Sequence, residues 1–327
     1  MKIHFKIVPI VLLTSIAMFV ACDNSKDSIT ESQIDTSTPI LNDLDIYLRE
    51  NFVAPYNIDI QYKWDVNDTS VNRYLHPSYE DNVEKIAEVL LDVWIAPYNT
   101  IGGENFIKNI APREFVLAGG FNYNPGVPTI TLGIAEAGAR ITLFNLDELD
   151  FSNIVYESDV LGSDDDFDVQ KSVVGPISTV HHEYGHILNQ NIPYDPAFDA
   201  INPGDYTAQW FNRSNEEARR LGYITNYASN QSSEDFVEMI AQMLIRSREQ
   251  WDELIDNIGV YNIDYPEDSD DIYILDDDGE RIINTEAINT IRRKEQLVVE
   301  YFSLQYGIDL YELQELTYQA LLDSVND

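Results

Sequence analysis

His182-Glu183-Tyr184-Gly185-His186 is the stretch of this 327-residue chain that decides the fold and the chemistry. It has the form H-E-x-x-H, and its surroundings predict a helix from about Asp168 to Gln190, with an irregularity at Gly175-Pro176. Histidines four residues apart lie on one face of a helix, so both imidazoles can bind a single Zn²⁺. The glutamate between them then lies beside the metal without binding it, where it can take a proton from the water that the metal activates.

A catalytic zinc ion commonly has three protein ligands, and a third histidine is not expected here. Asn189 and Ile192 occupy the glycine and histidine positions of the extended motif H-E-x-x-H-x-x-G-x-x-H. His181 points about 100° away from the ligand face, and we expect it to be a hydrogen-bonded flank of the helix. His76 precedes a proline in a predicted loop and is poorly placed for the site.

A carboxylate is the better candidate for the third ligand. Glu234 and Glu238 lie four residues apart at the start of a helix predicted to reach about Arg248, capped by Ser232 or Ser233. The first carboxylate can bind the metal while the second accepts the ring N–H of a ligating histidine. Asp235 lies off that face and is expected to be a first-turn acid favoured by the helix dipole. The alternative is that the two glutamates are solvated acids near a helix start.

Tyr227 precedes Glu234 by seven residues and is a candidate for the active site. A phenol near the metal can donate a hydrogen bond to the oxyanion of a tetrahedral intermediate. The alternative is a packing tyrosine, which is a common role in a chain with 20 tyrosines.

Residues 1–21 predict a secretory signal. A basic start precedes the apolar run Ile7–Val20, and a small residue stands before Cys22, as in lipoprotein cleavage sites. The alternatives are an ordinary signal peptide or an anchor helix. Cys22 is the only cysteine, so no intramolecular disulfide can form and lipid attachment is its expected role. Residues 22–38 are predicted to be a flexible tether that links a membrane anchor to the folded part.

The formal net charge of −37 at pH 7 argues against binding to nucleic acid. We interpret it as a solubilising surface, and a preference for cationic peptides is the sharper alternative. The run Asp164-Asp165-Asp166 is interpreted as a solvated loop, with Ca²⁺ binding as the alternative.

Residues 39–327 predict one α+β domain of the zincin-like kind, with a zinc cleft between two lobes. The N-terminal lobe, about 39–190, is mixed and contains a small β-sheet, whereas the C-terminal lobe, about 191–327, is mainly helical. The predicted elements are strands at Ile58–Trp64 and Glu114–Leu117, a hairpin joining 129–134 to 141–146, a helix at Glu80–Ile95 capped by Ser78, a helix at Asn215–Leu221 capped by Ser214, a hairpin over Ile272–Ile283, and helices at Thr285–Gln305 and Leu310–Ser324.

These segments resemble the gluzincin metallopeptidases. The motif at 182–186, Tyr227 and the E-D-F-V-E segment at 234–238 are similar to the catalytic domain of anthrax lethal factor, where H-E-F-G-H is followed by a tyrosine seven residues before E-F-F-A-E. The resemblance covers only these segments. It implies that zinc is bound by His182, His186 and Glu234, that Glu183 is the general base and that Tyr227 is the oxyanion donor.

The whole chain is similar to the zinc-binding metallopeptidase lipoproteins of Bacteroidota, also described as substrate import-associated zinc metallohydrolase lipoproteins. The matching features are Val20-Ala21-Cys22, His181-His182-Glu183 and the block from Asn226 to Glu238. This resemblance implies a lipid-anchored protein of the cell envelope, at the outer membrane, associated with an import complex of the SusC/SusD type.

The sequence therefore predicts a zinc-dependent metallohydrolase, in the first place a peptidase acting on a peptide or protein substrate. An edge strand of the 129–146 hairpin can align an extended peptide by backbone pairing. The main alternative is a non-catalytic substrate-binding lipoprotein of a SusC/SusD-type uptake system, with a structural or degenerate zinc site. A third interpretation is a hydrolase of non-peptide amides or of esters, built on the same site.

Overall fold

The computed structural model describes residues 40–64, 73, 75–126, 129–136, 139–156, 171–261 and 273–326. The predicted signal segment, Cys22, the tether and the acidic run Asp164–Asp166 lie outside these residues, and the predictions about them stay untested. The elements below belong to the unit Asn42–Asp327. Within the described ranges, no helix combines the length and the apolar composition that a membrane span requires.

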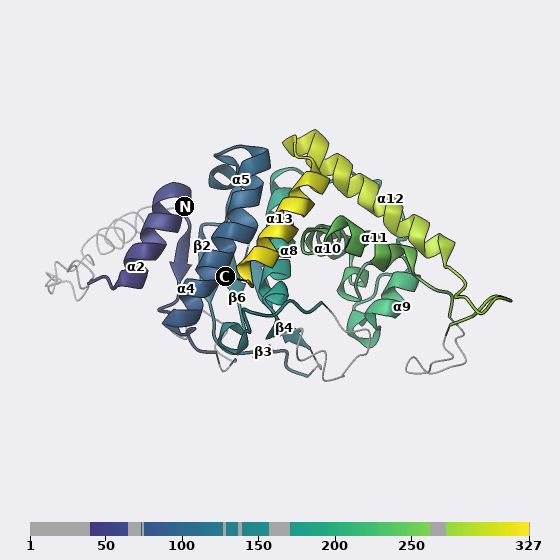
Figure 1. Ribbon diagram of the computed structural model, residues 1–327, viewed down its shortest axis with the longest axis horizontal. Coiled ribbons are helices and arrows are strands. Elements are labelled where there is room, and N and C mark those ends of the chain that lie inside the picture. Colours follow the sequence, from purple (N-terminus) through teal and green to yellow (C-terminus); the bar gives the residue numbers. More distant parts are fainter. Residues whose placement is uncertain are drawn as a thin grey trace, which may run out of the picture. The chain divides into compact units, whose positions relative to one another are not determined.

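A four-stranded mixed sheet with the order β1-β2-β6-β5 forms the centre of the N-terminal half (Figure 1). β1 (Asp59–Gln61), β2 (Glu114–Leu117) and β6 (Arg140–Leu143) run parallel, whereas β5 (Gly133–Glu136) pairs antiparallel with β6. The predicted hairpin is thus confirmed, and it places β5 at an edge of the sheet. Its first strand is shorter than expected, because β4 (Ile130–Thr131) pairs with β3 (Asn122–Tyr123) in a separate two-stranded sheet.

Helical segments of the N-terminal half share a hydrophobic core with this sheet. They are α2 (Asp43–Leu48), η1 (Arg49–Val53), α3 (Ala54–Tyr56), α4 (Glu80–Val89), η2 (Leu90–Ile95), α5 (Ala96–Gly102), α6 (Phe106–Ile110) and the turn η3 (Leu146–Glu148). The predicted helix from Glu80 is confirmed and continues without a break to Gly102. The predicted cap is wrong, because the Ser78 hydroxyl donates to Asp147 Oδ1 (2.7 Å) and Tyr79 occupies the N-cap position.

The motif helix α8 spans Val174–Asn191 and begins six residues later than predicted. Ser172 forms an isolated β-bridge with Asp150, and a chain paired in this way cannot be helical at that point. Pro176 lies in the first turn of α8, where a missing backbone N–H removes no intrahelical bond. Gly185 lets α8 approach α10 (Ser232–Leu244) closely, since a Cβ there would lie 3.0 Å from Val237 Cγ1.

The C-terminal half is helical, as predicted. Its elements are η4 (Trp210–Asn212), α9 (Asn215–Arg220), η5 (Tyr227–Ser229), α10, α11 (Arg248–Asp256), α12 (Thr285–Tyr301), η6 (Phe302–Tyr306) and α13 (Leu310–Ser324). Ser214 caps α9 as expected, whereas Gln231 occupies the N-cap position of α10 and neither predicted serine does. The hairpin prediction is confirmed by the antiparallel bridge between Leu275 and Arg281.

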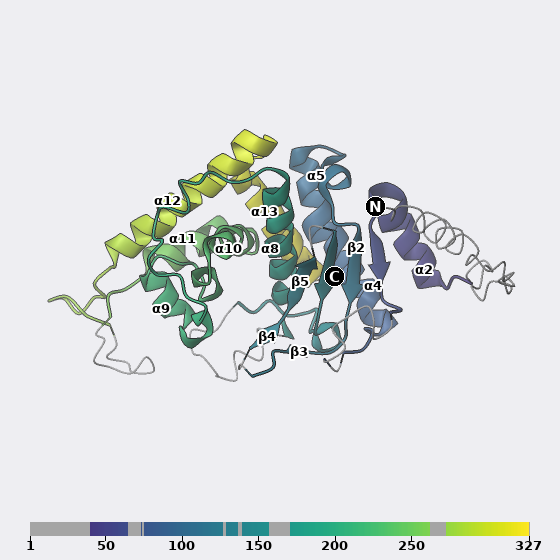
Figure 2. The ribbon, with the colours of Figure 1, turned by 180° about the vertical axis from the view of Figure 1, so that it is seen from behind.

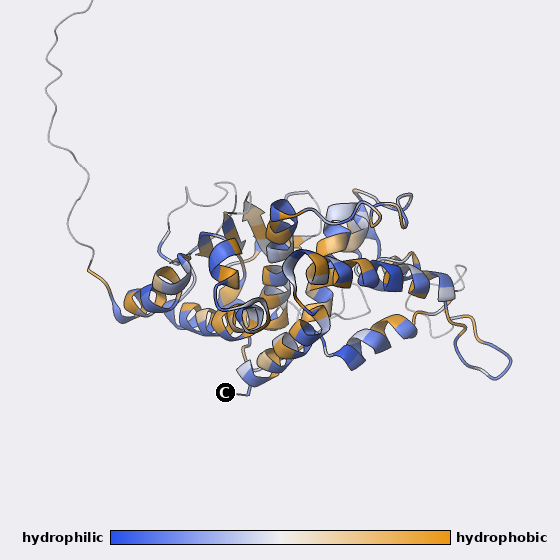
Figure 3. Cartoon of the chain, turned by 90° about the horizontal axis from the view of Figure 1, so that it is seen from above, coloured by the Kyte–Doolittle hydropathy of each residue, from blue (hydrophilic) through white to orange (hydrophobic). Residues whose placement is uncertain are grey.

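One hydrophobic core joins the two halves. Tyr184, on the helix face opposite the motif histidines, packs between Trp94 and Tyr98, with ring centroids 5.2 and 5.1 Å away. Alternating apolar and polar bands along the helices reflect this arrangement (Figure 3). A smaller cluster that includes Val116 and Phe144 covers the other face of the sheet. The predicted α+β fold, with a small sheet in the first half and helices in the second, is therefore confirmed, and α8 is packed within the core.

Candidate metal centre

α8 and α10 bring two histidines and a glutamate together. His182 and His186 lie on one face of α8, with ring centroids 4.9 Å apart. Glu234, in the first turn of α10, places Oε2 3.1 Å from His182 Nε2 and 3.2 Å from His186 Nε2. One ligand atom from each of the three residues lies within 4.8 Å of the others, so a single ion can contact all three. Two imidazole nitrogens and a carboxylate oxygen are a donor set that suits zinc.

The hydrogen bonds of His182 test whether a cation fits this site. Its Nδ1 lies 2.7 Å from Glu238 Oε1, while its Nε2 faces Glu234. A neutral imidazole can donate from only one nitrogen, so it cannot satisfy both carboxylates. Burial disfavours the charged ring, but hydrogen bonds to Glu234 and Glu238 outweigh burial and raise the pKa of His182 to about 10. The site thus attracts positive charge at Nε2, and zinc fits where that second proton would lie.

The carboxyl group of Glu234 is ionised, as binding to a metal cation requires. Burial alone would raise the pKa of its carboxyl, but hydrogen bonds from His182 and His186 outweigh burial and hold that pKa well below its usual range. The carboxylate is therefore ionised at neutral pH. The Gln231 side chain donates to Glu234 Oε1 (3.1 Å), which leaves Oε2 facing the two imidazoles.

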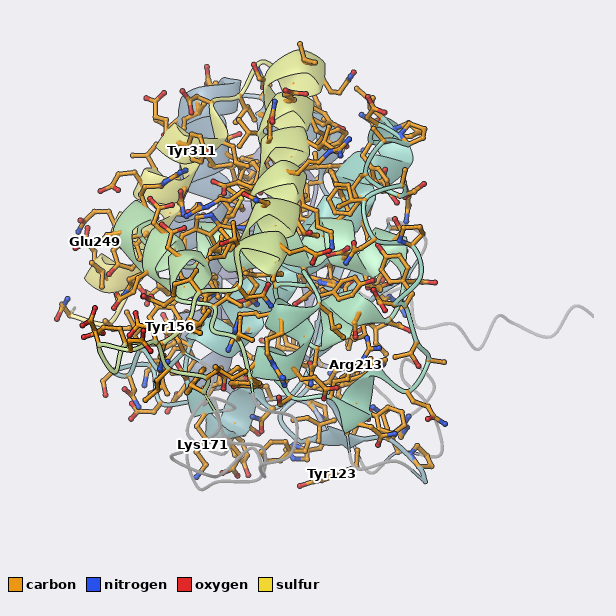
Figure 4. All side chains as sticks on the ribbon, turned by 90° about the vertical axis from the view of Figure 1, so that its right-hand side faces the viewer. Tyr123, Tyr156, Lys171, Arg213, Glu249 and Tyr311 are labelled. Atoms are coloured by element: carbon orange, nitrogen blue, oxygen red, sulfur yellow. The ribbon has the colours of Figure 1, made fainter. Side chains whose placement is uncertain are left out.

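Glu183 lines a cavity of about 530 Å³, and of the three residues above His182 also lines it. Its side chain is nearly buried, and burial raises the pKa of its carboxyl, although the neighbouring histidines counteract this. The backbone of Ala135, in the edge strand β5, is hydrogen-bonded to it. Other residues lining the cavity include His182, Glu238, Tyr227, Trp210 and Gly133. Tyr156, labelled in Figure 4, lines the cavity near the end of α10, where its hydroxyl donates to Ile245 O (3.0 Å).

Tyr227 also reaches this cavity, from the turn η5. Its ring centroid lies 5.7 Å from that of His182 and 4.9 Å from that of Trp210. Burial and the nearby carboxylates raise the pKa of the phenol well above its usual value. Tyr227 is therefore a protonated hydrogen-bond donor at neutral pH.

Thr225 is a residue of this site that sequence reasoning missed. Its hydroxyl donates to Glu238 Oε2 (2.6 Å), the oxygen that does not face His182. Gln231 was missed as well. It occupies the N-cap position of α10, three residues before Glu234, and side chains at this spacing can contact each other at the start of a helix. That spacing could have identified it. Thr225 carries no such local signal.

Asp235 lies in the first turn of α10, as expected, but it is fully buried, and its Oδ2 lies 2.6 Å from Lys294 Nζ on α12. The expectation for His181 is wrong. His181 is not a hydrogen-bonded flank, since neither ring nitrogen has a hydrogen-bond partner in the part of the chain that the structure describes. It is fully buried beside the Tyr98 ring, and burial lowers its pKa to about 3, so it stays neutral. His76 pairs with Asp147 (3.6 Å) and does not belong to the His182–His186–Glu234 group.

A helix with H-E-x-x-H, a glutamate from a second helix and an adjoining cavity define a protein of the zinc-metallopeptidase class. The chain belongs to the family described as "Putative zinc-binding metallo-peptidase", whose model matches residues 38–311. Among solved structures, it is similar to the crystal structure of a putative zinc-binding metallo-peptidase from Bacteroides caccae, with a TM-score of 0.60 and 25% sequence identity over 87% of this chain and 93% of that one. The comparison with curated proteins gave no match.

These comparisons confirm the predicted metallopeptidase resemblance and establish zinc as the cofactor. The likeness to anthrax lethal factor, the lipoprotein assignment and the lobe boundaries at 39–190 and 191–327 stay predictions.

Proposed function

We propose that this protein is a zinc-dependent peptidase whose metal is held by His182, His186 and Glu234, with Glu183 as general base. The observation that carries the proposal is that three ligand atoms lie within 4.8 Å of one another while the Glu183 carboxylate lines the adjoining cavity. When bound, zinc polarises the scissile carbonyl and lowers the pKa of the attacking water.

Glu183 moves the proton in this proposal. Its carboxylate accepts a proton from the attacking water and passes it to the amine that leaves. Burial raises the pKa of this carboxyl, which makes the carboxylate a stronger base than one in water. The intact base is also the reason to prefer a peptidase over a non-catalytic binding protein, which would not need a buried carboxylate beside the metal ligands.

Tyr227 stabilises the oxyanion in this proposal. Its hydroxyl is protonated at neutral pH and can donate a hydrogen bond to the carbonyl oxygen as that oxygen gains charge. The edge-to-face contact with Trp210 and the nearby His182 ring restrict the phenol to the side of the cavity where the reaction takes place.

The edge strand β5 aligns the substrate, because its free side faces the active-site helix (Figure 2). Leu132 O accepts from Phe144 N, so the polar backbone groups of Leu132 point toward β6 and those of Gly133 point away from it. Gly133 lines the cavity and can pair with an extended peptide. An extended backbone substrate favours peptides over small amides or esters.

We also propose, from residues 1–22 alone, that the enzyme is attached by a lipid on Cys22 to the cell envelope, at the outer membrane. The resemblance to import-associated lipoproteins supports a place beside a SusC/SusD-type complex. Metabolic labelling with a palmitate analogue tests this, and a Cys22→Ser variant that still takes up the label would contradict it.

The substitution Glu183→Gln tests the catalytic proposal. We expect the variant to bind one zinc per chain, as the parent does, and to lose at least 10²- to 10⁴-fold in peptide hydrolysis, the range for a lost general base. Glu249→Gln, on the exposed surface of α11 (Figure 4), is the matched control and should hydrolyse like the parent. Hydrolysis by Glu183→Gln at the parent rate, or a zinc-loaded parent that cleaves no peptide library, would overturn the proposal.

A further inference from the structure

The buried hydroxyl of Thr225 contacts both the carboxylate of Glu238 and the turn that carries Tyr227. The Thr225 side chain is 5% exposed. Its Oγ1 donates to Glu238 Oε2 (2.6 Å) and accepts from the backbone N–H of Ala228 (3.1 Å). A threonine hydroxyl has one proton to donate, so the bond to Glu238 uses all of its donor capacity.

The first contact controls the orientation of Glu238. Each oxygen of this carboxylate has its own partner: Oε1 accepts from His182 Nδ1 (2.7 Å), and Oε2 accepts from Thr225. With both oxygens held, the carboxylate plane is fixed, and so is the plane of the imidazole that it contacts. The proton of His182 is then kept on Nδ1, which leaves Nε2 directed at Glu234.

The second contact controls the turn that carries Tyr227. Ala228 is in the middle of η5 (Tyr227–Ser229), and its N–H is held by a side chain three residues earlier, a local bond that stabilises the start of a helical turn. The same hydroxyl thus connects the Tyr227 turn to the carboxylate that orients His182.

We propose that Thr225 is a positioning residue of the metal centre, which acts through Glu238 on the zinc affinity and through η5 on the placement of Tyr227. The proposal rests on the assignment of His182 as a zinc ligand and, for its second part, on the proposed peptidase function. Thr225 Oγ1 is hydrogen-bonded to Glu238 and to Ala228 and to none of the three proposed metal ligands, so we expect its effects on the metal to pass through these two neighbours.

The isosteric substitution Thr225→Val removes the hydroxyl and keeps the shape. We expect zinc binding, measured by competition with a chromogenic chelator, to weaken about tenfold, at the lower end of the 10- to 100-fold effects of partners that orient metal ligands. Thr225→Ser keeps the hydroxyl and should bind zinc like the parent. Thr317→Val is the matched control, because Thr317 is fully buried and donates to Leu244 O (2.8 Å) at the C-terminal end of α10. It should lower stability and leave zinc affinity unchanged.

A double-mutant cycle separates positioning from a general structural role. If Thr225 acts through Glu238, Thr225→Val should change the zinc affinity little when Glu238 is already alanine. An equal loss in both backgrounds, or parent-like affinity of Thr225→Val, would overturn the first part of the proposal. If the valine variant does not fold, Thr225→Ala takes its place in the same cycle.

The kinetic readout tests the second part. Thr225→Val saturated with zinc should show a lower kcat with little change in KM, because misplacement of Tyr227 affects the transition state more than substrate binding. An unchanged kcat at full zinc occupancy would overturn this part. If the parent binds zinc and cleaves no peptide, the peptidase proposal fails, while the affinity measurements still decide whether Thr225 positions the metal centre.

Discussion

Replacing Lys294 by methionine tests how α10, the helix that carries Glu234 and Glu238, is held in place. Lys294 Nζ lies 2.6 Å from Asp235 Oδ2, and both side chains are fully buried. Burial raises the pKa of Asp235 to about 6 and lowers that of Lys294, even though each charge attracts the other. Asp235 directly follows Glu234, so the ion pair anchors the turn that presents the proposed metal ligand.

The expected loss is large because the substitution leaves a buried carboxylate without its counter-charge. Removing one partner of a buried pair typically costs about 3–5 kcal/mol. The Asp235 pKa, about 6 in the parent, rises further without the ammonium group, whereas in the unfolded chain it is near 3.9. Between these values the folded state holds more protons than the unfolded state, so stability falls as pH rises, by up to about 1.4 kcal/mol per pH unit. The difference in the free energy of unfolding between the parent and the variant should therefore increase above about pH 6.

Urea unfolding at pH 5.5 and at pH 7.5 measures both effects. The double variant Asp235→Leu with Lys294→Met should recover most of the lost stability, because no charge is then buried alone. Lys63→Met, which breaks the exposed pair with Asp45, is the control and should cost no more than about 1 kcal/mol. A Lys294→Met variant with the parent's urea midpoint at pH 7.5, or with the same loss at both pH values, would refute this reasoning.

Two further predictions concern the metal and the substrate. Without metal the pKa of His182 is about 10, so its ring is charged at pH 7.5 and zinc must replace one of its protons. Calorimetry at pH 7.5 in buffers of different ionisation enthalpy should therefore show about one proton released per zinc. Release of no proton would contradict the charged ring. Gly133→Val should raise KM for peptides and leave zinc affinity unchanged, because a Cβ at Gly133 would lie 2.1 Å from Thr179 Cγ2 and push β5 away from α8. Gly204→Val, where a Cβ meets nothing within 4 Å, is the control, and equal KM values in the two variants would argue against substrate alignment by β5.

The features that could be predicted from the sequence are those set by local geometry. Residues four apart share a helix face wherever that helix lies, so the pairing of His182 with His186 and of Glu234 with Glu238 followed from spacing alone. The meeting of the two pairs is a tertiary event, and it was expected only because catalytic zinc commonly needs a third protein ligand.

The features that could not be predicted depend on partners far along the chain. Asp235 looked like an ordinary first-turn acid, because nothing near it shows that Lys294 will lie beside it. His181 shares the polarity of its neighbours in the motif, yet it faces the core and contacts the Tyr98 ring. The start of α8 was placed too early because the bridge between Asp150 and Ser172 competes with the helix, and helical periodicity does not reveal that pairing.

The charge balance of the site predicts a structural role for the metal in addition to its proposed chemical one. Glu183, Glu234 and Glu238 are each only 8% exposed, and they surround the same imidazole. Without metal, the proton that raises the charge of His182 offsets only one of these three negative groups. A divalent ion offsets more, and it binds where the folded chain gathers its ligands, whereas the unfolded chain keeps them apart. Zinc should therefore stabilise the folded state by mass action, and the hydroxyl of Thr225 and the amide of Gln231 keep the carboxylates in place for it.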